Sequence, residues 1–432
     1  MTTPNGPILF NSSTGSDSNA SGLGPASAVS GSGAELDGTS TVDVSYDGMD
    51  LSSISAGDLL YCSTSAGRQF SIIASVDTIN ETITTDDAWP TESGVSWAVG
   101  GKRASIIGSS RLLANDGKYD SILQLEDSYS ETFSSGITIS IGGLTLRGEL
   151  GAANKPVLTF TNNTKSVQLG NDSITVQNIE LQNTATTTSS TFAFNVSNNT
   201  TLCRLIDVSV DHQTNNYYHC VKVHASGTTG IICDGCSFGY TTNTGIYLSV
   251  AAHAQTSIRH CRIFNCQSHA FDNAYSNPFV FAFNLVYGNG GSGITRTNSF
   301  AYIVGNVFYD NAGNGVSLSG YNNQVVSNVF VGNAYGLSDD ASGDYSQYVR
   351  GNAFYNNTSG ETNNLSPVMD SITLTADPFT DAANVDFSLN SNAGGGAVLR
   401  AETMVIGSTT SYPFNWLTDG SGGGSPFHPL AQ

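Results

Sequence analysis

The chain has 432 residues, of which only 12% are charged, 39% are hydrophobic and 47 are glycine. This composition excludes a disordered acidic tail and favours many short strands joined by turns over long helices. The 35 acidic residues against 15 basic ones give a net charge of −20, which repels phosphate backbones and anionic lipids. We therefore expect no nucleic-acid partner and no membrane insertion.

The first two segments in chain order come before any repeat. Residues 1–40 are rich in Gly, Ser and Asn, which predicts an extended arm. Residues 41–103 contain alternating hydrophobic runs such as Gln69–Val76, which predict a small β subdomain that caps the open end of a longer structure. The first residues show no secretory signal, so we expect the seven cysteines to be buried thiols of a protein that folds in the cytoplasm.

A repeat of about 22 residues governs the middle of the chain. The segment that starts at Asn306 (NVFYDNAGNGV) recurs at Asn328 (NVFVGNAYGL) and Asn352 (NAFYNN), and earlier copies start at 284, 261 and 236. Weaker copies are assigned to Asn178 and Asp207. A period of this length is typical of one coil of a solenoid, and we predict such coils over residues 104–376.

Three hydrophobic columns within the repeat predict three short strands in each coil. One column runs from Phe238 to Phe354, a second from Ile246 to Leu337 and a third from Cys233 to Val349. Stacked columns of like residues are typical of the interior of a parallel β-helix, in which each coil buries its apolar edge against its neighbours. Asn at the repeat start from Asn284 onward, and again five residues later (Asn289, Asn311, Asn333 and Asn357), suits turns whose side-chain amides bond to the next coil.

Residues 377–432 lack the repeat and predict a C-terminal capping segment followed by a Gly-rich tail. The tail sequence GSGGGS is a flexible linker that carries a short apolar tip with Phe427 and Leu430. We expect these two side chains to serve assembly with another subunit.

The repeat Asn-x-Phe-x-x-Asn…Gly-Ile/Val resembles the right-handed parallel β-helix of pectate-lyase-like proteins and phage tailspikes. The C-terminal segments Asp377-Pro-Phe and Asp386-Phe-Ser-Leu also resemble β-helix proteins of bacteriophages. The resemblance implies an all-β fold, a right-handed parallel β-helix solenoid with a small N-terminal β cap and extended terminal arms. It carries no active-site motif of a lyase, epimerase or hydrolase onto this chain.

Two groups of residues have the chemistry of metal ligands. Cys233, Cys236, Cys261, Cys266 and His269 could bind zinc, but their places in the columns favour stacked thiols. Asp339, Asp340 and Asp344 could bind Ca²⁺ through side-chain oxygens, but an acidic solvated turn explains them without a metal. We expect no metal and no cofactor.

One inserted loop mixes acidic, basic and aromatic groups. Asp211, His219 and Lys222 are the candidates for acid–base chemistry on a polysaccharide, and His212, Tyr217 and Tyr218 are the candidates for glycan binding. An exposed polar loop without function accounts for the same residues.

Three functions remain open. The first is a virion structural protein of a bacteriophage, a capsid-decorating or tail-associated fibre or spike that is assembled in the host cytoplasm. Its partners would be copies of itself, as a trimer, other virion proteins and a host-surface glycan. The second is a polysaccharide lyase or hydrolase, and the third is a bacterial surface adhesin. We expect the structural, non-enzymatic function.

Overall fold

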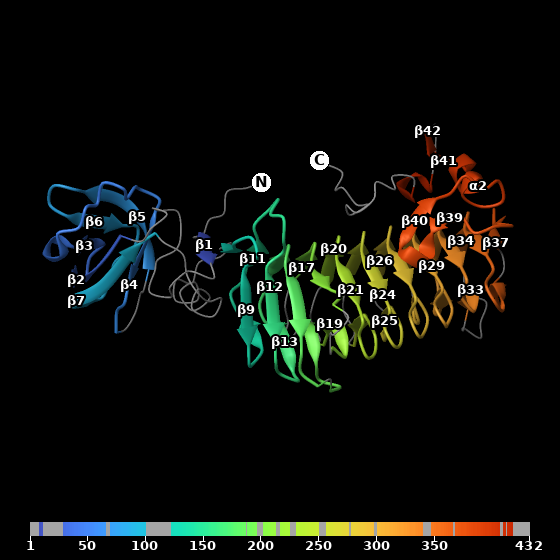
Figure 1. Cartoon of the computed structure of the whole chain (residues 1–432), viewed down its shortest axis with the longest axis horizontal. Coiled ribbons are helices and arrows are strands. Elements are labelled where there is room, and N and C mark those ends of the chain that lie inside the picture. The colour runs from blue at the N-terminus through green and yellow to red at the C-terminus, as the bar shows by residue number, and fades with distance from the viewer. Residues whose placement is uncertain are drawn as a thin grey trace. The chain divides into compact units, whose positions relative to one another are not determined.

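The computed structural model describes residues 8–11, 29–65, 70–100, 122–186, 188–196, 202–212, 217–224, 230–249, 256–275, 278–297, 300–339, 347–365, 368–406, 409–411 and 413–417. The chain divides into two units, and Figure 1 labels their strands. The first is Met1–Thr159 with Leu169–Leu181, and the second is Phe160–Gln168 with Gln182–Gln432.

The first unit contains a closed antiparallel barrel with the strand order β2-β3-β6-β5-β4-β7. Its elements are β2 (Val29–Asp37), β3 (Thr41–Asp43), η1 (Ser45–Asp47), β4 (Leu59–Cys62), β5 (Phe70–Asp77), β6 (Thr82–Thr85) and β7 (Thr91–Val99). Asp47 joins η1 to β2 and β7. Its carboxylate accepts hydrogen bonds from Ser32 N, Gly33 N and Trp97 Nε1 at 3.1, 3.0 and 2.6 Å. The ring of Trp97 lies in the barrel core.

The first unit also contains strands of parallel coils. They are β1 (Ile8–Asn11), β8 (Ile122–Leu125), β9 (Ser130–Phe133), β10 (Ile137–Ile139), β11 (Thr145–Gly148) and β14 (Thr175–Gln177). Strands β12 (Val157–Phe160), β13 (Lys165–Leu169) and β15 (Glu180–Asn183) contain the points where the chain passes from one unit to the other.

The prediction of an extended arm over residues 1–40 is wrong for the described part. Strand β1 pairs in parallel with β8, so residues 8–11 belong to a coil sheet. Strand β2 pairs with β7 and β3, so the barrel begins at Val29 instead of residue 41. The reason is that the alternation of β2 buries Ala34 and Leu36 in the barrel despite its glycines.

The second unit is a solenoid of three parallel sheets, which we number in the order in which the chain visits them. Sheet 1 contains β17 (Cys203–Ile206), β20 (Ile231–Asp234), β23 (Thr256–Arg259), β26 (Phe279–Ala282), β28 (Ala301–Val304), β31 (Gln324–Val326), β34 (Tyr348–Arg350) and β37 (Val368–Met369). Sheet 2 contains β18 (Ser209–Val210), β21 (Ser237–Gly239), β24 (Arg262–Phe264), β27 (Leu285–Tyr287), β29 (Val307–Tyr309), β32 (Val329–Val331), β35 (Ala353–Tyr355) and β38 (Ile372–Thr373). Sheet 3 contains β16 (Phe192–Val196), β19 (His219–Val223), β22 (Ile246–Leu248) and β25 (Phe271–Asn273), and then β30 (Val316–Leu318), β33 (Tyr335–Asp339) and β36 (Gly360–Asn363). Isolated bridges through Ile294 link the two parts of sheet 3.

The three predicted columns are confirmed as the inward faces of these sheets. In sheet 2, Phe308 pairs in register with Phe330, and Phe330 with Phe354. Their rings stack with centroids 5.1 and 5.3 Å apart, close to the spacing of parallel strands. A small residue precedes the sheet 3 column because a Cβ at Gly293 would lie 2.5 Å from Phe308 Cδ1.

The turn between sheets 1 and 2 is a single residue with positive φ. In successive coils it is Asn178, Asp207, Gly235, His260, Phe283, Gly305, Ser327 and Gly351. These positions correct the two weakest repeat assignments, because Asn178 and Asp207 occupy the turn itself and not the position after it. The residues that follow the turn, from Cys236 onward, start the later repeats as predicted.

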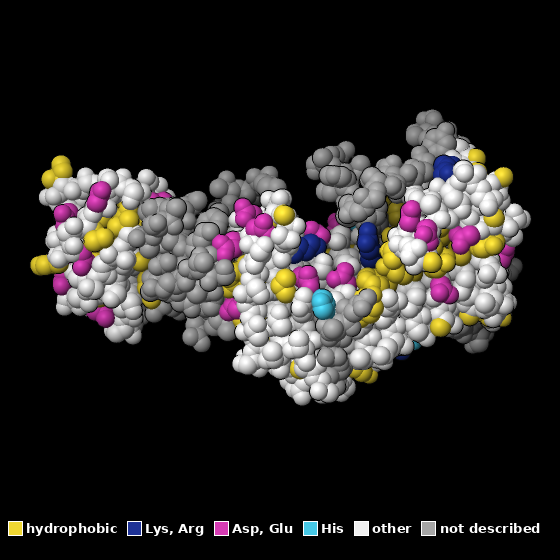
Figure 2. All heavy atoms as spheres, viewed as in Figure 1, with side chains coloured by type: hydrophobic (Ala, Val, Ile, Leu, Met, Phe, Trp, Pro, Cys, Tyr) yellow, Lys and Arg dark blue, Asp and Glu magenta, His cyan; other side chains and the backbone are white. Residues whose placement is uncertain are grey.

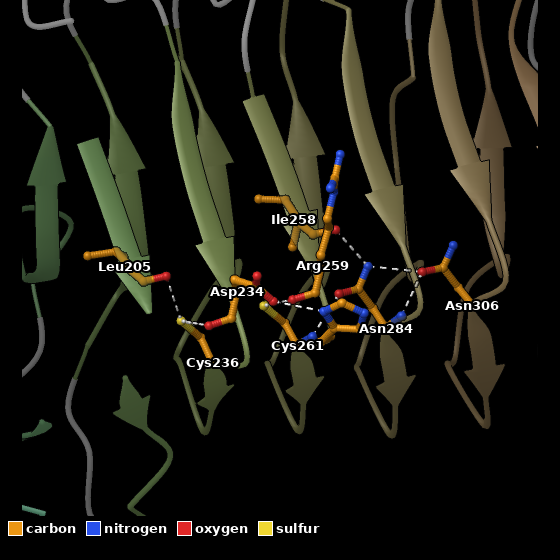
Figure 3. Close-up of polar contacts among 9 residues, drawn as sticks. Leu205, Asp234, Cys236, Ile258, Arg259, Cys261, Asn284 and Asn306 are labelled. Atoms are coloured by element: carbon orange, nitrogen blue, oxygen red, sulfur yellow. Dashed lines mark hydrogen bonds and ion pairs between the residues drawn. The ribbon is translucent and has the colours of Figure 1, made fainter. Parts of the chain in front are cut away.

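An asparagine ladder follows this turn through four coils. Asn284 Nδ2 donates to Asn306 Oδ1 at 2.9 Å, and the same contact joins Asn306 to Asn328 and Asn328 to Asn352. Each amide also donates to a backbone carbonyl of the preceding coil, as Asn306 does to Phe281 O at 2.8 Å. Cys261 and Cys236 take the ladder position in the two earlier coils, where their thiols bond to backbone carbonyls (Figure 3).

The C-terminal segment folds back over the outer face of sheet 2. It contains β39 (Phe379–Asp381), η2 (Ala382–Asn384), β40 (Asp386–Leu389), α2 (Gly396–Ala401), β41 (Met404–Ile406), β42 (Thr409–Ser411) and η3 (Asn415–Leu417). Phe379, Phe387 and Leu399 pack with outward residues of sheet 2 such as Val307 and Val329. Figure 2 shows the resulting band of hydrophobic side chains between this segment and the coils. The segment therefore covers a side of the solenoid, and Phe427 and Leu430 lie outside the described residues.

We predict that Asn306→Ala lowers the free energy of unfolding by about 3–5 kcal/mol, because it leaves Asn284 and Phe281 with unpaired buried polar atoms. Asn357→Ala is the matched control at the end of a second ladder, where the half-buried side chain bonds with Asn333 and Phe330 O and water can replace it after truncation. We expect it to cost about 1 kcal/mol. Urea denaturation measures the free energy of unfolding of both variants. Equal losses would contradict a larger contribution from Asn306, whose amide bonds to the coils on both sides.

Candidate functional site

Side chains of several chemical types gather on the outer face of sheet 3. Strands β16, β19, β22 and β25 pair in parallel, with Asn195, Lys222, Tyr247 and Asp272 in register. Partners in register point to the same face of a sheet, about 4.8 Å apart. These four side chains therefore form one outward column, which we call the sheet 3 cluster together with Phe192, His219 and Arg296.

A row of stacked rings crosses three coils of the cluster. The ring of His219 stacks between Phe192 and Tyr247, with centroid distances of 5.7 and 5.0 Å and interplanar angles near 25°. Tyr218 meets His219 edge to face at 4.7 Å. Phe192 and His219 are buried, whereas Tyr218 and Tyr247 keep part of their rings exposed. The row therefore offers a partly exposed aromatic edge on a rigid base.

His219 is held as a neutral base. Its Nδ1 lies 2.9 Å from Thr244 O, a carbonyl that can only accept, so Nδ1 carries the proton and Nε2 does not. Burial lowers the pKa of His219 to about 4, against the smaller opposing effect of the Thr244 carbonyl. At neutral pH the side chain is uncharged.

Lys222 is one of the two cations of the cluster, and Arg296 is the other. Its Nζ lies 4.5 Å from the centroid of the Phe192 ring and 6.0 Å from that of Tyr247, within cation–π range of the first. Burial, and then the positive charge of Lys165, lowers the pKa of Lys222. Lys222 therefore brings a partly buried positive charge to the outer face of sheet 3.

Asp272 and Arg296 form a closed pair beside the rings. Arg296 Nε and Nη2 donate to the two carboxylate oxygens of Asp272 at 2.8 and 2.5 Å. The Asp272 side chain is 9% exposed, while that of Arg296 is 48% exposed. Such a bidentate pair fixes the geometry of both groups.

The structure brings together only part of the predicted site. His219 and Lys222 lie in the cluster, and Tyr218 contacts it through the ring of His219. Tyr217 does not, because it is fully buried and its hydroxyl bonds with Ser166 Oγ at 3.0 Å, so the prediction of a glycan-binding ring there is wrong. Asp211 follows β18 in sheet 2 and accepts from Ser237 Oγ at 2.5 Å, away from the strand that carries His219.

The remaining candidates lie apart from the cluster. His212 is exposed beside Asp211. Asp339 is buried in β33 and accepts from Gln347 Nε2 at 3.3 Å, while Asp340 and Asp344 fall outside the described residues. Within the described ranges, no group of three His, Cys, Asp or Glu side chains is arranged to hold a metal ion.

The sequence contained a signal for the residues that were missed. Tyr247 and Asp272 directly follow Ile246 and Phe271 of the second hydrophobic column, so alternation places them on the outer face. The same column continues back to Val221 and Phe194, which points to Lys222 and Asn195. Phe192 gave no such signal, because its position depends on a coil longer than the repeat.

The seven cysteines are all free and buried. Burial raises the pKa of the Cys266 thiol to about 11 and raises those of Cys220, Cys233 and Cys261 well above the ordinary value. A buried thiol that resists ionisation is a poor nucleophile and a poor metal ligand. These cysteines therefore act as small core residues.

The family model described as "Right handed beta helix region" matches residues 193–359. The chain contains a right-handed β-helix. No curated protein matches the sequence. Among the described residues, no helix is long and apolar enough to cross a membrane.

Several solved structures share the fold of the β-helix at low identity. The Geobacillus virus E2 protein ORF18 is 12% identical, with a TM-score of 0.47, over 63% of this chain and 59% of the other. Pectate lyase Pel9A is 11% identical with a TM-score of 0.41, over 67% and 80%. The Dettilon tailspike protein is 11% identical with a TM-score of 0.29, over 63% and 65%. The chain thus spans 59% of the Geobacillus virus protein, and these similarities concern the fold alone.

The low pKa of His219 predicts acid sensitivity. Between pH 6.5 and 4 the unfolded side chain binds a proton that the folded one does not, so the free energy of unfolding falls as the pH falls. This loss amounts to about 3 kcal/mol across that window. We expect His219→Gln to remove this pH dependence. The difference in free energy of unfolding between variant and native protein therefore changes by about 3 kcal/mol from pH 7 to pH 4. A gap that stays constant in denaturation at both pH values would contradict a buried neutral His219.

Proposed function

We propose that this protein is a structural component of a bacteriophage particle that contacts a host-surface glycan through the sheet 3 cluster. The observation that carries the proposal is the row of Phe192, His219 and Tyr247 rings with Lys222 above it. A sugar has apolar C–H faces and a polar rim of hydroxyl groups. Partly exposed rings can contact the apolar faces of a sugar, and the charged groups beside them can hydrogen-bond to its hydroxyl groups. The rings supply contact area and the polar groups fix the orientation of the sugar.

The β-helix supports this function by holding the cluster rigid. Each ring belongs to a strand that is fixed by in-register pairing on both sides, so little conformational entropy is lost on binding. Tyr275, which is 47% exposed, follows β25 and adds another ring close enough to act on the pKa of Tyr247. A glycan can therefore contact groups from several coils at once.

The thiols support production inside a host cell. A fold with seven free buried cysteines does not need an oxidising compartment to reach its native state. This suits a particle protein that is assembled in the host cytoplasm and is then located on the virion. We propose that this chain is a fibre, spike or capsid decoration of the particle. It would act as a homo-oligomer, such as a trimer, together with other virion proteins.

We predict that Tyr247→Ala weakens binding to a host-surface glycan at least tenfold, about 1.4 kcal/mol, because it removes the exposed end of the ring row. Tyr302→Ala is the matched control, since Tyr302 is 46% exposed but lies on sheet 1. Glycan-array binding of the full chain measures both. Equal binding by the native protein and Tyr247→Ala would refute the placement of the glycan.

The virion assignment has its own test in the C-terminal tail. We expect deletion of residues 420–432, which carry Phe427 and Leu430, to leave the melting temperature nearly unchanged and to reduce oligomerisation or incorporation into particles at least tenfold. The reason is that a flexible linker of this kind can deliver its apolar tip to a neighbouring subunit. Normal assembly of the truncated protein would remove the tail from the proposal, and absence of the protein from purified particles would refute the virion role.

A second candidate is a polysaccharide lyase or hydrolase, and one observation favours it. His219 is neutral and Lys222 has a lowered pKa in the same cluster, as general bases require. The test is depolymerisation of acidic polysaccharides, followed by viscosity and by absorbance of unsaturated products. Activity that is lost in Lys222→Gln would replace the structural function by the enzymatic one.

A further inference from the structure

The outer face of sheet 1 carries exposed aromatic rings in three successive coils. Tyr302, Gln324 and Tyr348 pair in register on β28, β31 and β34, so their side chains point to the same face about 4.8 Å apart. Tyr302 is 46% exposed and Tyr348 is 41% exposed. Phe300 and Tyr321, which precede β28 and β31, are 45% and 46% exposed, and their rings meet edge to face at 5.3 Å. Four half-exposed rings thus gather along one side of the solenoid.

The rest of this side is aliphatic and uncharged. Val304 and Val326 pair in register in a second outward column of the same strands, and both are half-buried. Strands β26, β28 and β31 contain no charged residue. Covering this surface would therefore remove no charge from water, which is the costly step when a protein surface is buried. We call the surface the sheet 1 face, and it consists of Phe300, Tyr302, Val304, Tyr321, Gln324, Val326 and Tyr348.

The same coils cover their outward rings on sheet 2. Tyr309 follows Tyr302 in one coil and packs against Phe379 and Phe387 of the C-terminal segment, with ring centroids 6.0 and 5.5 Å apart. On the sheet 1 face, by contrast, the rings keep almost half of their surface exposed. Four rings exposed to this extent leave about 350 Å² of aromatic surface in water. An apolar patch of this size is among the largest that monomeric proteins expose, and it commonly marks a contact with another protein.

The occupant that fits the sheet 1 face is another copy of this chain. The chain is acidic, with a net charge of −20, so two copies repel each other wherever their carboxylates face one another. Strands without charged residues let the copies approach at the least electrostatic cost. The columns also run along the solenoid axis, so coils laid side by side bring the same surface of each copy together, as a closed symmetric assembly requires.

We propose that the sheet 1 face is the contact between copies of this chain, which lie side by side around a symmetry axis parallel to the solenoid. The inference rests on the proposed function, in which the protein is a homo-oligomer, and it names the surface that holds the copies together. The rings of Tyr302 and Tyr348 pack against the equivalent face of the next copy. Sheet 3 forms another side of the solenoid, so the sheet 3 cluster stays accessible to a glycan in the assembly.

Tyr302→Glu tests the contact because it places a charge in the middle of an uncharged face. We expect the full native chain to sediment as a homo-oligomer, and the variant to self-associate at least tenfold more weakly with an unchanged circular dichroism spectrum. Tyr302→Ala keeps the face uncharged and leaves three of the rings, so we expect it to remain associated. Tyr46→Glu is the matched control, since it adds the same charge to a ring that is 74% exposed on the barrel. We expect it to sediment as the native protein does.

Cross-linking tests the position of the contact without changing the charge of the face. The seven native thiols are all buried, so a cysteine introduced on the surface is the reactive one. Gln324→Cys replaces the residue between Tyr302 and Tyr348, and we expect oxidised glutathione to convert it to a disulfide-linked dimer. Ile79→Cys is the control, because Ile79 is 90% exposed on the barrel. We expect its dimer to form at least tenfold more slowly on non-reducing gels.

Three results would overturn the inference. The first is a native chain that sediments as a monomer at every concentration. The second is a Tyr302→Glu variant that associates as tightly as the native chain while Gln324→Cys cross-links no faster than Ile79→Cys. The third is a monomeric native chain that loses glycan binding in Tyr302→Glu, which would make the sheet 1 face a glycan surface.

The outcomes also separate this inference from the proposed function. If deletion of residues 420–432 dissociates the oligomer and Tyr302→Glu does not, the inference fails and the proposed particle protein stands. If the copies associate through the sheet 1 face but the protein is absent from purified particles, the contact stands and the proposed virion function fails.

Discussion

The in-register stacking of one coil on the next is the constraint on which the rest of this structure depends. Each coil is too thin to bury its own hydrophobic edge, so strand pairing and core formation must happen together. Two features fix that register: the positive-φ turn between sheets 1 and 2, and the asparagine ladder that follows the turn. Asn306, for example, bonds to the coils on both sides. A slip by one residue would turn every inward side chain outward and leave the ladder amides unpaired. The ladder therefore makes a repeated sequence specify one register.

The regular coils and the candidate site occupy different stretches of the solenoid. The ladder runs through Asn284 to Asn352, where turn residues are 22 to 24 positions apart. The sheet 3 cluster lies mainly on β16 to β25, in coils whose turns are 23 to 29 residues apart and whose ladder positions include Cys236 and Cys261. The ladder of asparagines is found in the shorter coils, whereas the rings of Phe192, His219 and Tyr247 meet on the outside of the longer ones.

The sequence was sufficient to predict the interior of the solenoid but not its exterior. Phe308, Phe330 and Phe354 repeat at fixed spacing because they contact their own copies, and such self-contact leaves a periodic pattern. The C-terminal segment left none, since Phe387 packs on Tyr287 and Tyr309 through contacts that occur once. Strand β2 was not predicted, because its glycines are unusual in a strand. Tyr217 was assigned to the exterior, because the sequence of an insertion does not show whether a ring points inward. Lys222 and His219 were found for their chemistry, while Asn195 and Tyr247 required the register.

Net charge is a poor guide to what the sheet 3 cluster can bind. Residues 29–99 contain 11 acidic residues and one basic residue, so this segment accounts for −10 of the −20 total. Charges act across about 8 Å at physiological salt, so a ligand at Lys222 responds to the few groups around it and not to the sum over the chain. Those groups are Lys165, which is positive, and Asp272, which Arg296 neutralises. Because half of the net charge lies in residues 29–99, the sum over the chain does not describe the electrostatic environment of Lys222.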